Sequence, residues 1–228
     1  MLSQSHRLSV ALVCAAAIAL PTADASAQAA SNPNLNAQLL VGARQDDIAQ
    51  VERVLAHGAV PNSRNRLGKT ALLLACEKGN LRLADVMLRN GADITMVSIE
   101  GVTPLMAASY AGNAELVKRL LAAGARTEPV DRMKKPAIVY AAGRGHAAVV
   151  DALLVSGIDV NATYEHRLTL LMWAAGQGHA DVVELLLARG ARADLRDDRG
   201  LSALDIARQT HQTESLALLD PRRTLLTH

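Results

Sequence analysis

The sequence predicts an all-α solenoid, in which short helix-turn-helix units joined by hairpin-like loops stack one on the next. A 33-residue period runs through the chain without a gap, and two columns of mostly glycine follow it. These columns are Gly68, Gly101, Lys134, Arg167, Gly200 and Gly58, Gly91, Gly124, Gly157, Gly190. With no Phe, three Tyr and one Trp, the core must consist mainly of Ala, Leu and Val, which suits close helix packing.

The first 27 residues predict a secretory signal peptide. A basic start, MLSQSHR, precedes the apolar run LSVALVCAAAIAL and an A-x-A cleavage signal at Ala25 to Ala27. The run is shorter than the roughly 18 to 20 residues that span a bilayer, so we expect no membrane span after its removal. Cleavage leaves a flexible linker at 28–34 and a repeat domain at 35–228, and we expect a periplasmic or secreted protein.

Cleavage also removes Cys14 and leaves Cys76 as the single cysteine. We therefore expect no internal disulfide, so the fold must depend on packing. Cys76 shares its column with serine and alanine, which predicts a buried, inert thiol.

The first helix of each repeat begins at a capping residue. This column reads Thr70, Thr103, Pro136, Thr169 and Ser202. Hydroxyl groups accept hydrogen bonds from the free amides of a helix start, and proline is tolerated in the first turn. The helix is expected to end at the glycine of position 79, 112, 145 or 178, because glycine adopts the left-handed conformation without steric cost.

The second helix carries paired apolar columns with four-residue spacing, which predicts one buried face. These columns are Val51, Ala84, Val117, Val150, Val183 and Leu55, Leu88, Leu121, Leu154, Leu187. The expected repeats are about 35–67, 68–100, 101–133, 134–166, 167–199 and 200–228, with the first and last acting as caps.

The segments GVTPLMAASYAGNAELVKRLLAAGA and HADVVELLLARGARAD resemble the ankyrin repeat family. The resemblance covers about 190 residues, nearly all of the expected mature chain. It implies a stack of helix pairs that binds protein partners through its loop tips and through the concave face made by the first helices.

Two departures from the family pattern stand out. The histidine that follows T-P-L in the family is replaced by Leu73, Met106, Val139, Met172 and Asp205. We expect the hydrogen bonds of that histidine to be missing. The loop glycine is replaced by Lys134 and Arg167, so these two loops are either strained or differently shaped.

Two histidines stand in the column that begins the second helix, which reads Asp47, Asn80, Asn113, His146, His179 and Gln212. Asp and Asn are preferred helix caps, so capping or local loop bonding is the favoured interpretation. The alternative is a metal- or haem-associated protein that uses His146, His179 and His166. Zinc needs three or four ligands, and no further ligands recur at fixed spacing, so we expect no metal and no cofactor.

Trp173 shares its column with Leu74, Ala107, Tyr140 and Ile206. One interpretation is packing between repeats, and the other is an aromatic binding patch formed by Tyr140 and Trp173. The two are not exclusive.

Other motifs do not favour catalysis or nucleic-acid binding. The chain contains no G-x-S-x-G, H-E-x-x-H or phosphate-loop motif. The basic stretches RNRLGK and RMKK are diluted by nearby acidic residues, and the formal net charge is only +2. We therefore predict a monomeric, non-enzymatic scaffold that binds another protein.

The predicted partner-binding residues occupy variable columns of the loops and first helices. Apolar side chains stand where solvent would otherwise be expected, with basic ones around them, as in binding hot spots. The predicted set is Val97, Ile99, Val102, Tyr110, Met133, Arg132, Lys135, Arg144, Glu165, His166, Leu168, Trp173 and Gln177. The alternative for some of them is burial under neighbouring loops.

Overall fold

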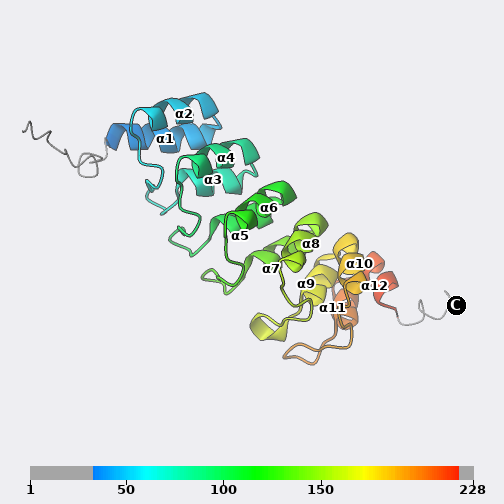
Figure 1. Ribbon diagram of the computed structural model, residues 1–228. Helices are drawn as coiled ribbons and strands as arrows, with labels where there is room; N and C mark the ends of the chain where they lie inside the picture. The colour runs from blue at the N-terminus through cyan, green and yellow to red at the C-terminus, as the bar shows by residue number, and fades with distance from the viewer. Residues whose placement is uncertain (1–32, 221–228) are drawn as a thin grey trace, which may run out of the picture. The chain divides into compact units, whose positions relative to one another are not determined.

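The computed structural model describes residues 33–220 (Figure 1). This part of the chain holds twelve α-helices, one 3-10 helix and no β-strand, with an isolated antiparallel bridge between Thr163 and Thr169. The elements are α1 (Pro33–Gln45), α2 (Ile48–Ala56), α3 (Ala71–Glu77), α4 (Leu81–Arg89), α5 (Pro104–Ala111), α6 (Ala114–Ala122), α7 (Ala137–Gly143), α8 (Ala147–Val155), η1 (Glu165–Arg167), α9 (Leu170–Gln177), α10 (Ala180–Ala188), α11 (Ala203–Gln209) and α12 (Thr213–Leu219). The predicted all-α class is confirmed.

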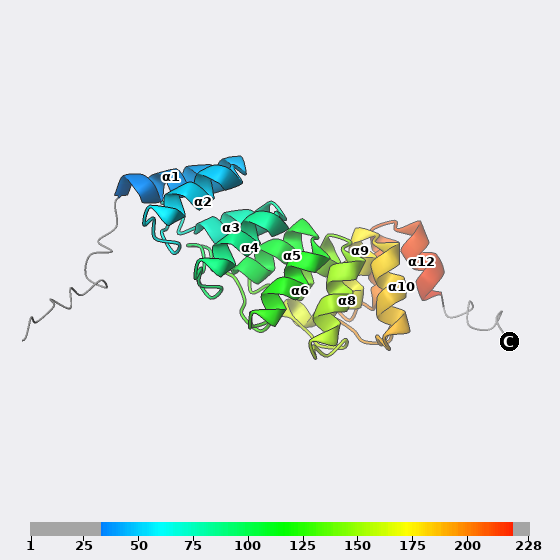
Figure 2. The ribbon, with the colours of Figure 1, turned by 45° about the horizontal axis from the view of Figure 1, so that its top comes forward.

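Each repeat contributes one helix to each of two layers. The odd-numbered helices from α1 to α11 contact one another in chain order, and so do the even-numbered helices from α2 to α12 (Figures 1 and 2). The loops between repeats project on one side of the stack (Figure 1). Neighbouring repeats thus bury the apolar faces that a single helix pair leaves open, which is the predicted solenoid.

The predicted signal peptide lies outside the described residues, as does the linker up to residue 32. Helix α1 begins at Pro33, so the last two residues of the predicted linker are helical. Among residues 33–220, no helix combines the length and the apolar character needed to cross a membrane.

The first helices begin at the predicted caps. The hydroxyls of Thr70, Thr103, Thr169 and Ser202 each accept the N–H three residues later, at 3.1 to 3.2 Å. Pro136 holds the same place before α7, where no side chain caps the helix. The glycines that follow these helices, at positions 79, 112, 145 and 178, have φ between 64° and 82°. The predicted starts and ends agree with the structure.

The expected loss of hydrogen bonds at the histidine position of the family is wrong in three repeats. The N–H of the capping residue donates to Met106 Sδ at 3.5 Å in α5 and to Met172 Sδ at 3.4 Å in α9. In α11 it donates to Asp205 Oδ2 at 3.1 Å. A flexible thioether or a short carboxylate reaches back to the helix start and completes a capping box.

The buried face of the second helices differs in part from the prediction. The column Val51, Ala84, Val117, Val150 and Val183 is fully buried. The leucine column that begins at Leu55 is only half-buried. Its place in the core is taken by Val54, Met87, Leu120, Leu153 and Leu186. The buried stripe therefore follows i, i+3 spacing, and the predicted leucines lie at its edge.

Most loops between repeats are organised by one polar side chain. Asn65, Ser98, Asp131 and Asp197 each accept the N–H groups of the second and fourth residues after them. Tyr164 holds the equivalent position in the next-to-last of these loops and cannot make these bonds. That loop forms η1 instead, with His166 at φ 59° and Arg167 at φ 56°.

The two loops that lack glycine therefore have different backbone conformations. Lys134 has φ 54°, in the left-handed region that glycine occupies in the other loops, and its loop keeps the bonds to Asp131. This position is strained for a lysine. The loop at Arg167 is strained in the same way and is also differently shaped.

Candidate functional site

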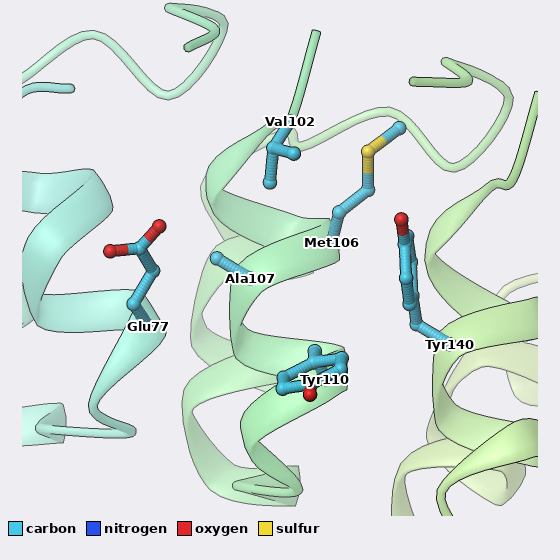
Figure 3. A pocket seen from close by; sticks show the side chains of 6 residues that line it. All are labelled: Glu77, Val102, Met106, Ala107, Tyr110 and Tyr140. Carbon is cyan, nitrogen blue, oxygen red and sulfur yellow. The ribbon is translucent and has the colours of Figure 1, made fainter. Parts of the chain in front are cut away.

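A cavity of about 310 Å³ opens on the surface formed by α3, α5, α7 and α9, which we call the first-helix face. Its lining is mostly apolar and consists of Glu77, Val102, Met106, Ala107, Tyr110 and Tyr140. In Figure 3, Glu77 and Tyr140 stand on either side of α5, whose side chains form the floor. The cavity thus spans three consecutive repeats.

The cavity exists because Ala107 is the smallest member of its column. Larger members fit against the previous repeat: a Cβ built on Gly143 would lie 3.8 Å from the Trp173 ring. A Cβ built on Gly176 would lie 2.9 Å from Ile206 Cγ2. At Ala107 no side chain extends that far, so the space between Glu77 and Tyr140 stays open.

Two tyrosines form one wall of the cavity. The rings of Tyr110 and Tyr140 meet edge to face, with 5.9 Å between centroids and an interplanar angle of 75°. Tyr140 donates its hydroxyl hydrogen to Asp131 Oδ2. Burial, followed by that contact with Asp131, raises the pKa of Tyr140, so the phenol stays protonated and remains a donor. The ring is held in place, while Tyr110 is 47% exposed.

Two cations lie over the aromatic rings of this face. The Arg144 guanidinium lies 4.5 Å from the Tyr110 centroid, and Lys135 Nζ lies 4.8 Å from the Trp173 centroid. Both are cation–π contacts. Within residues 33–220, neither cation has a carboxylate at ion-pair distance, so both can accept one from a partner.

The predicted aromatic patch of Tyr140 with Trp173 is not the ring pair that the structure contains. Among the described residues, the ring partner of Tyr140 is Tyr110. Trp173 is half-buried against Gly143, and its Nε1 is buried without a hydrogen-bond partner in the described part of the chain. Packing between repeats therefore accounts for much of the burial of Trp173.

The structure places the remaining predicted residues at the loop tips near the cavity, at the end of α9 and around η1. Near the cavity, Val97, Ile99 and Met133 are 36%, 51% and 58% exposed at the loop tips, so neighbouring loops do not bury them. Arg132 is exposed beside them and Gln177 is exposed at the end of α9. Since these residues do not line the cavity, their part in binding stays a prediction.

The last group lies around η1. His166 and Leu168 line a second cavity of about 350 Å³ together with residues 197–199. Glu165 Oε1 lies 3.2 Å from Lys134 Nζ, so this carboxylate already has a partner. The thirteen predicted residues thus do not form one continuous site.

His146 and His179 stand at the helix starts as expected, but their side chains do not cap α8 and α10, so that expectation is wrong. Each ring reaches back to the previous repeat instead. His146 Nε2 lies 3.0 Å from the Tyr110 carbonyl oxygen, and His179 Nε2 lies 3.0 Å from that of Gly143. Since a carbonyl only accepts, Nε2 carries the donated hydrogen. These histidines connect neighbouring repeats.

The alternative metal or haem site needs His166 beside these two residues. His166 lies in η1, with Nδ1 3.8 Å from Asp198 Oδ2. Within residues 33–220, no three His, Cys, Asp or Glu side chains are grouped as metal ligands. The structure therefore does not bring the three histidines together.

Cys76 is fully buried, as predicted. Burial, with a smaller contribution from Glu77, raises the pKa of its thiol, which keeps it protonated and unreactive.

Sequence reasoning missed Asp131 and Met106 as parts of the site. Asp131 fixes both its own loop and Tyr140. It stands in a 33-residue column with Asn65, Ser98 and Asp197, and this periodicity was the available signal.

Comparison with known proteins gives a family and two partial relatives. A family model described as ankyrin repeats (3 copies) matches residues 29–131, 77–164 and 138–222. A mitochondrial disaggregase of Homo sapiens is 41% identical over 63 residues, which is 28% of this chain and 9% of that protein. A mitochondrial disaggregase of Bos taurus is 41% identical over 58 residues, 25% of this chain and 9% of that protein. The chain spans less than a tenth of the length of these relatives. Because the family model matches most of the sequence, repeat after repeat, the chain belongs to the ankyrin repeat family.

Proposed function

We propose that this protein is an exported, monomeric, non-enzymatic scaffold that binds a partner protein through its first-helix face and loop tips. Membership of the ankyrin repeat family supports a protein-interaction role. The proposed place of action is the periplasm or the outside of the cell, and its support is the signal-peptide pattern of residues 1–27.

The observation that carries the proposal is the cavity beside the Tyr110–Tyr140 pair. Binding hot spots are rigid aromatic anchors beside pockets, with charged groups at the rim. Here the fixed Tyr140 ring and the exposed Tyr110 ring border an apolar cavity, and Arg144 lies over one of them. Exposed Ile99 and Met133 add apolar area on the adjacent loop tips.

A photo-crosslinking experiment tests the surface. We would place benzoylphenylalanine at Tyr110, at Ile99 or at Val155, express the protein in its native host and identify adducts by mass spectrometry. Val155 is the matched control, because it is 72% exposed but lies on α8 in the other layer. We expect one partner to be captured from positions 110 and 99. Adducts from position 155 alone would contradict the proposed surface.

A second experiment measures affinity for the captured partner. Val97→Asp, Ile99→Asp and Tyr110→Ala place charges on the loop tips or remove an aromatic anchor. We expect each to weaken binding of the purified partner, with the largest loss for Tyr110→Ala. Unchanged affinity in all three variants would rule out this face.

Export needs a separate test. We would express the full sequence in a bacterium, fractionate the cells and determine the N-terminus of the protein. We expect a periplasmic or secreted product that begins at Gln28, and we expect Ala27→Asp to block processing. An unprocessed wild-type protein retained in the cytoplasm would contradict export and leave the binding proposal unaffected.

A further inference from the structure

Given the proposed function, we infer that the cavity above Ala107 takes one large apolar side chain from an extended, acidic segment of the partner protein. A neighbouring carboxylate of that segment then pairs with Arg144, on the α7 side of the cavity. This assigns a chemistry to the partner and a direction to its binding.

The shape of the cavity suits a side chain that arrives on a peptide backbone. Its volume of about 310 Å³ is at the lower end of ligand pockets, which range from roughly 300 to 1,000 Å³. It opens along the first-helix face, where Tyr110 is 47% exposed, so an occupant can be buried on one side while its backbone remains outside. Val102, Met106 and Ala107 provide an apolar lining that favours an apolar occupant.

The charges around the cavity favour an acidic segment. Glu77 is already paired with Lys69, with 2.6 Å between Nζ and Oε1. Asp131 accepts two loop N–H groups with Oδ1 and the Tyr140 hydroxyl with Oδ2. Arg144 and Lys135 have no carboxylate partner among the described residues, so the free charge on the α7 side is positive.

The same charges give the segment a direction. Glu100 is exposed at the loop tip, and its negative charge contributes to the raised pKa of Tyr140, so it lies on the loop side of the site. The side chain of Arg132, whose backbone N–H donates to the Glu100 carbonyl, is exposed next to it, so the two opposite charges offset each other on the loop side. Arg144 has no such offset among the described residues, so a partner carboxylate is attracted towards Arg144. The guanidinium, which lies over Tyr110, presents a planar fork of donors that matches a carboxylate.

A peptide selection tests the inference on the purified protein. The probe is a phage-displayed library of random dodecapeptides, and affinities of the selected peptides are measured by fluorescence polarisation. We expect enriched peptides to carry a Leu, Met, Phe or Trp with an Asp or Glu within about three residues. The Ala107→Leu variant fills the cavity and Arg144→Gln removes the charge, and each should weaken binding about tenfold.

Matched variants on the other layer provide the controls. Ala122→Leu adds the same bulk at an exposed position of α6, and Arg82→Gln removes the same charge from α4. Both should bind the peptides as the wild type does. Arg144→Lys should recover only part of the affinity, because lysine lacks the planar fork.

Three outcomes would overturn the inference. They are enrichment without the acidic–apolar pattern, equal binding by Ala107→Leu, and failure to select any peptide. If the crosslinks from Tyr110 persist in any of these cases, the proposed function stands and only the partner chemistry is wrong. If those crosslinks are also absent, the proposed function fails as well.

Discussion

Single residues determine where the first-helix face is filled and where it is hollow. Tyr110 meets Tyr140 thirty positions later, and Gly143 meets Trp173 over the same interval. The matching interval from Glu77 ends at Ala107, the smallest residue of its column, and the cavity lies there. A substitution at Ala107 therefore changes this face at one defined place.

Lys134 gives a prediction at this scale. It adopts a φ of 54°, which costs an L-residue roughly 1–2 kcal/mol. Glycine adopts this conformation freely but loses more entropy on folding, roughly 0.5–1 kcal/mol. We expect Lys134→Gly to raise the free energy of unfolding by about 0.5–1 kcal/mol, as measured by urea denaturation. The exposed ion pair with Glu165 is a small loss.

The reverse substitution is the control. Gly200 has φ 78° in the equivalent loop position, and a Cβ there has open space around it. Gly200→Lys should therefore lower stability through backbone strain alone. A destabilised Lys134→Gly protein would contradict the strain argument.

Because two tyrosines have raised pKa values, we expect the free energy of unfolding to fall at alkaline pH. Burial raises the pKa of Tyr164 to about 12, and burial and Asp131 raise that of Tyr140. In the unfolded chain both titrate near 10. Above pH 10 the unfolded state releases protons that the folded state retains, so the free energy of unfolding decreases as pH rises. Below pH 10 this contribution is fully present.

Thermal unfolding of Tyr164→Phe and Tyr140→Phe between pH 8 and 12 checks this sign. Each variant lacks one titrating phenol, so its Tm should fall less steeply than that of the wild type above pH 10. Parallel curves would mean that the folded state does not perturb the tyrosines.

At the scale of elements, the side chain at the start of the second helix can do two things. It can cap its own helix, and it can hydrogen-bond to the backbone of the previous repeat. Asn113 performs both, since its Oδ1 accepts the Leu116 N–H at 3.0 Å and its Nδ2 donates to the Gly79 carbonyl at 2.7 Å. His146 performs only the second task, towards the Tyr110 carbonyl. The second helices that begin at a histidine are thus bonded to the previous repeat, but no side chain caps their starts.

This difference predicts the effect of His146→Asn. The asparagine can cap α8 and still reach the previous repeat, so we expect a gain in unfolding free energy of about 0.5–1 kcal/mol by chemical denaturation. His146→Ala removes the bridge without adding a cap and should destabilise the protein. If His146→Asn is no more stable than His146→Ala, the assigned roles are wrong.

Some features of the helices could be predicted from the sequence, and others could not. Helix starts and ends were predictable because caps and glycines act within a few residues of one another. The spacing of apolar residues did not distinguish Val54 from Leu55 as the core position, since both flank the same helical face. The cavity was not predictable because its walls come from side chains of different repeats, and their fit depends on packing across the stack.

At the scale of the whole repeat array, backbone hydrogen bonds join successive loop tips. Ile99 N–H donates to the Leu67 carbonyl at 3.0 Å, and Arg132 N–H donates to that of Glu100 at 3.0 Å. Asp198 N–H likewise donates to the His166 carbonyl at 3.1 Å. The loop between the last two, at Glu165, has an exposed side-chain ion pair with Lys134 in place of that bond. This series of backbone hydrogen bonds between loop tips is therefore interrupted at the loop in which Tyr164 and Arg167 depart from the pattern.

Hydrogen exchange measures this interruption directly. In residues 131–135 every backbone N–H has a hydrogen-bond acceptor, whereas in the described structure the N–H groups of Glu165 and His166 have none. We expect the segment 163–168 to exchange faster than 97–102 and 130–135 in mass spectrometry, because exchange reports local opening. The double substitution Tyr164→Asp with Arg167→Gly restores the side chain and glycine found around Asp197 and should slow exchange in this segment alone. Equal exchange of the three wild-type segments, or no change in the double variant, would show that Tyr164 does not set the stability of this loop.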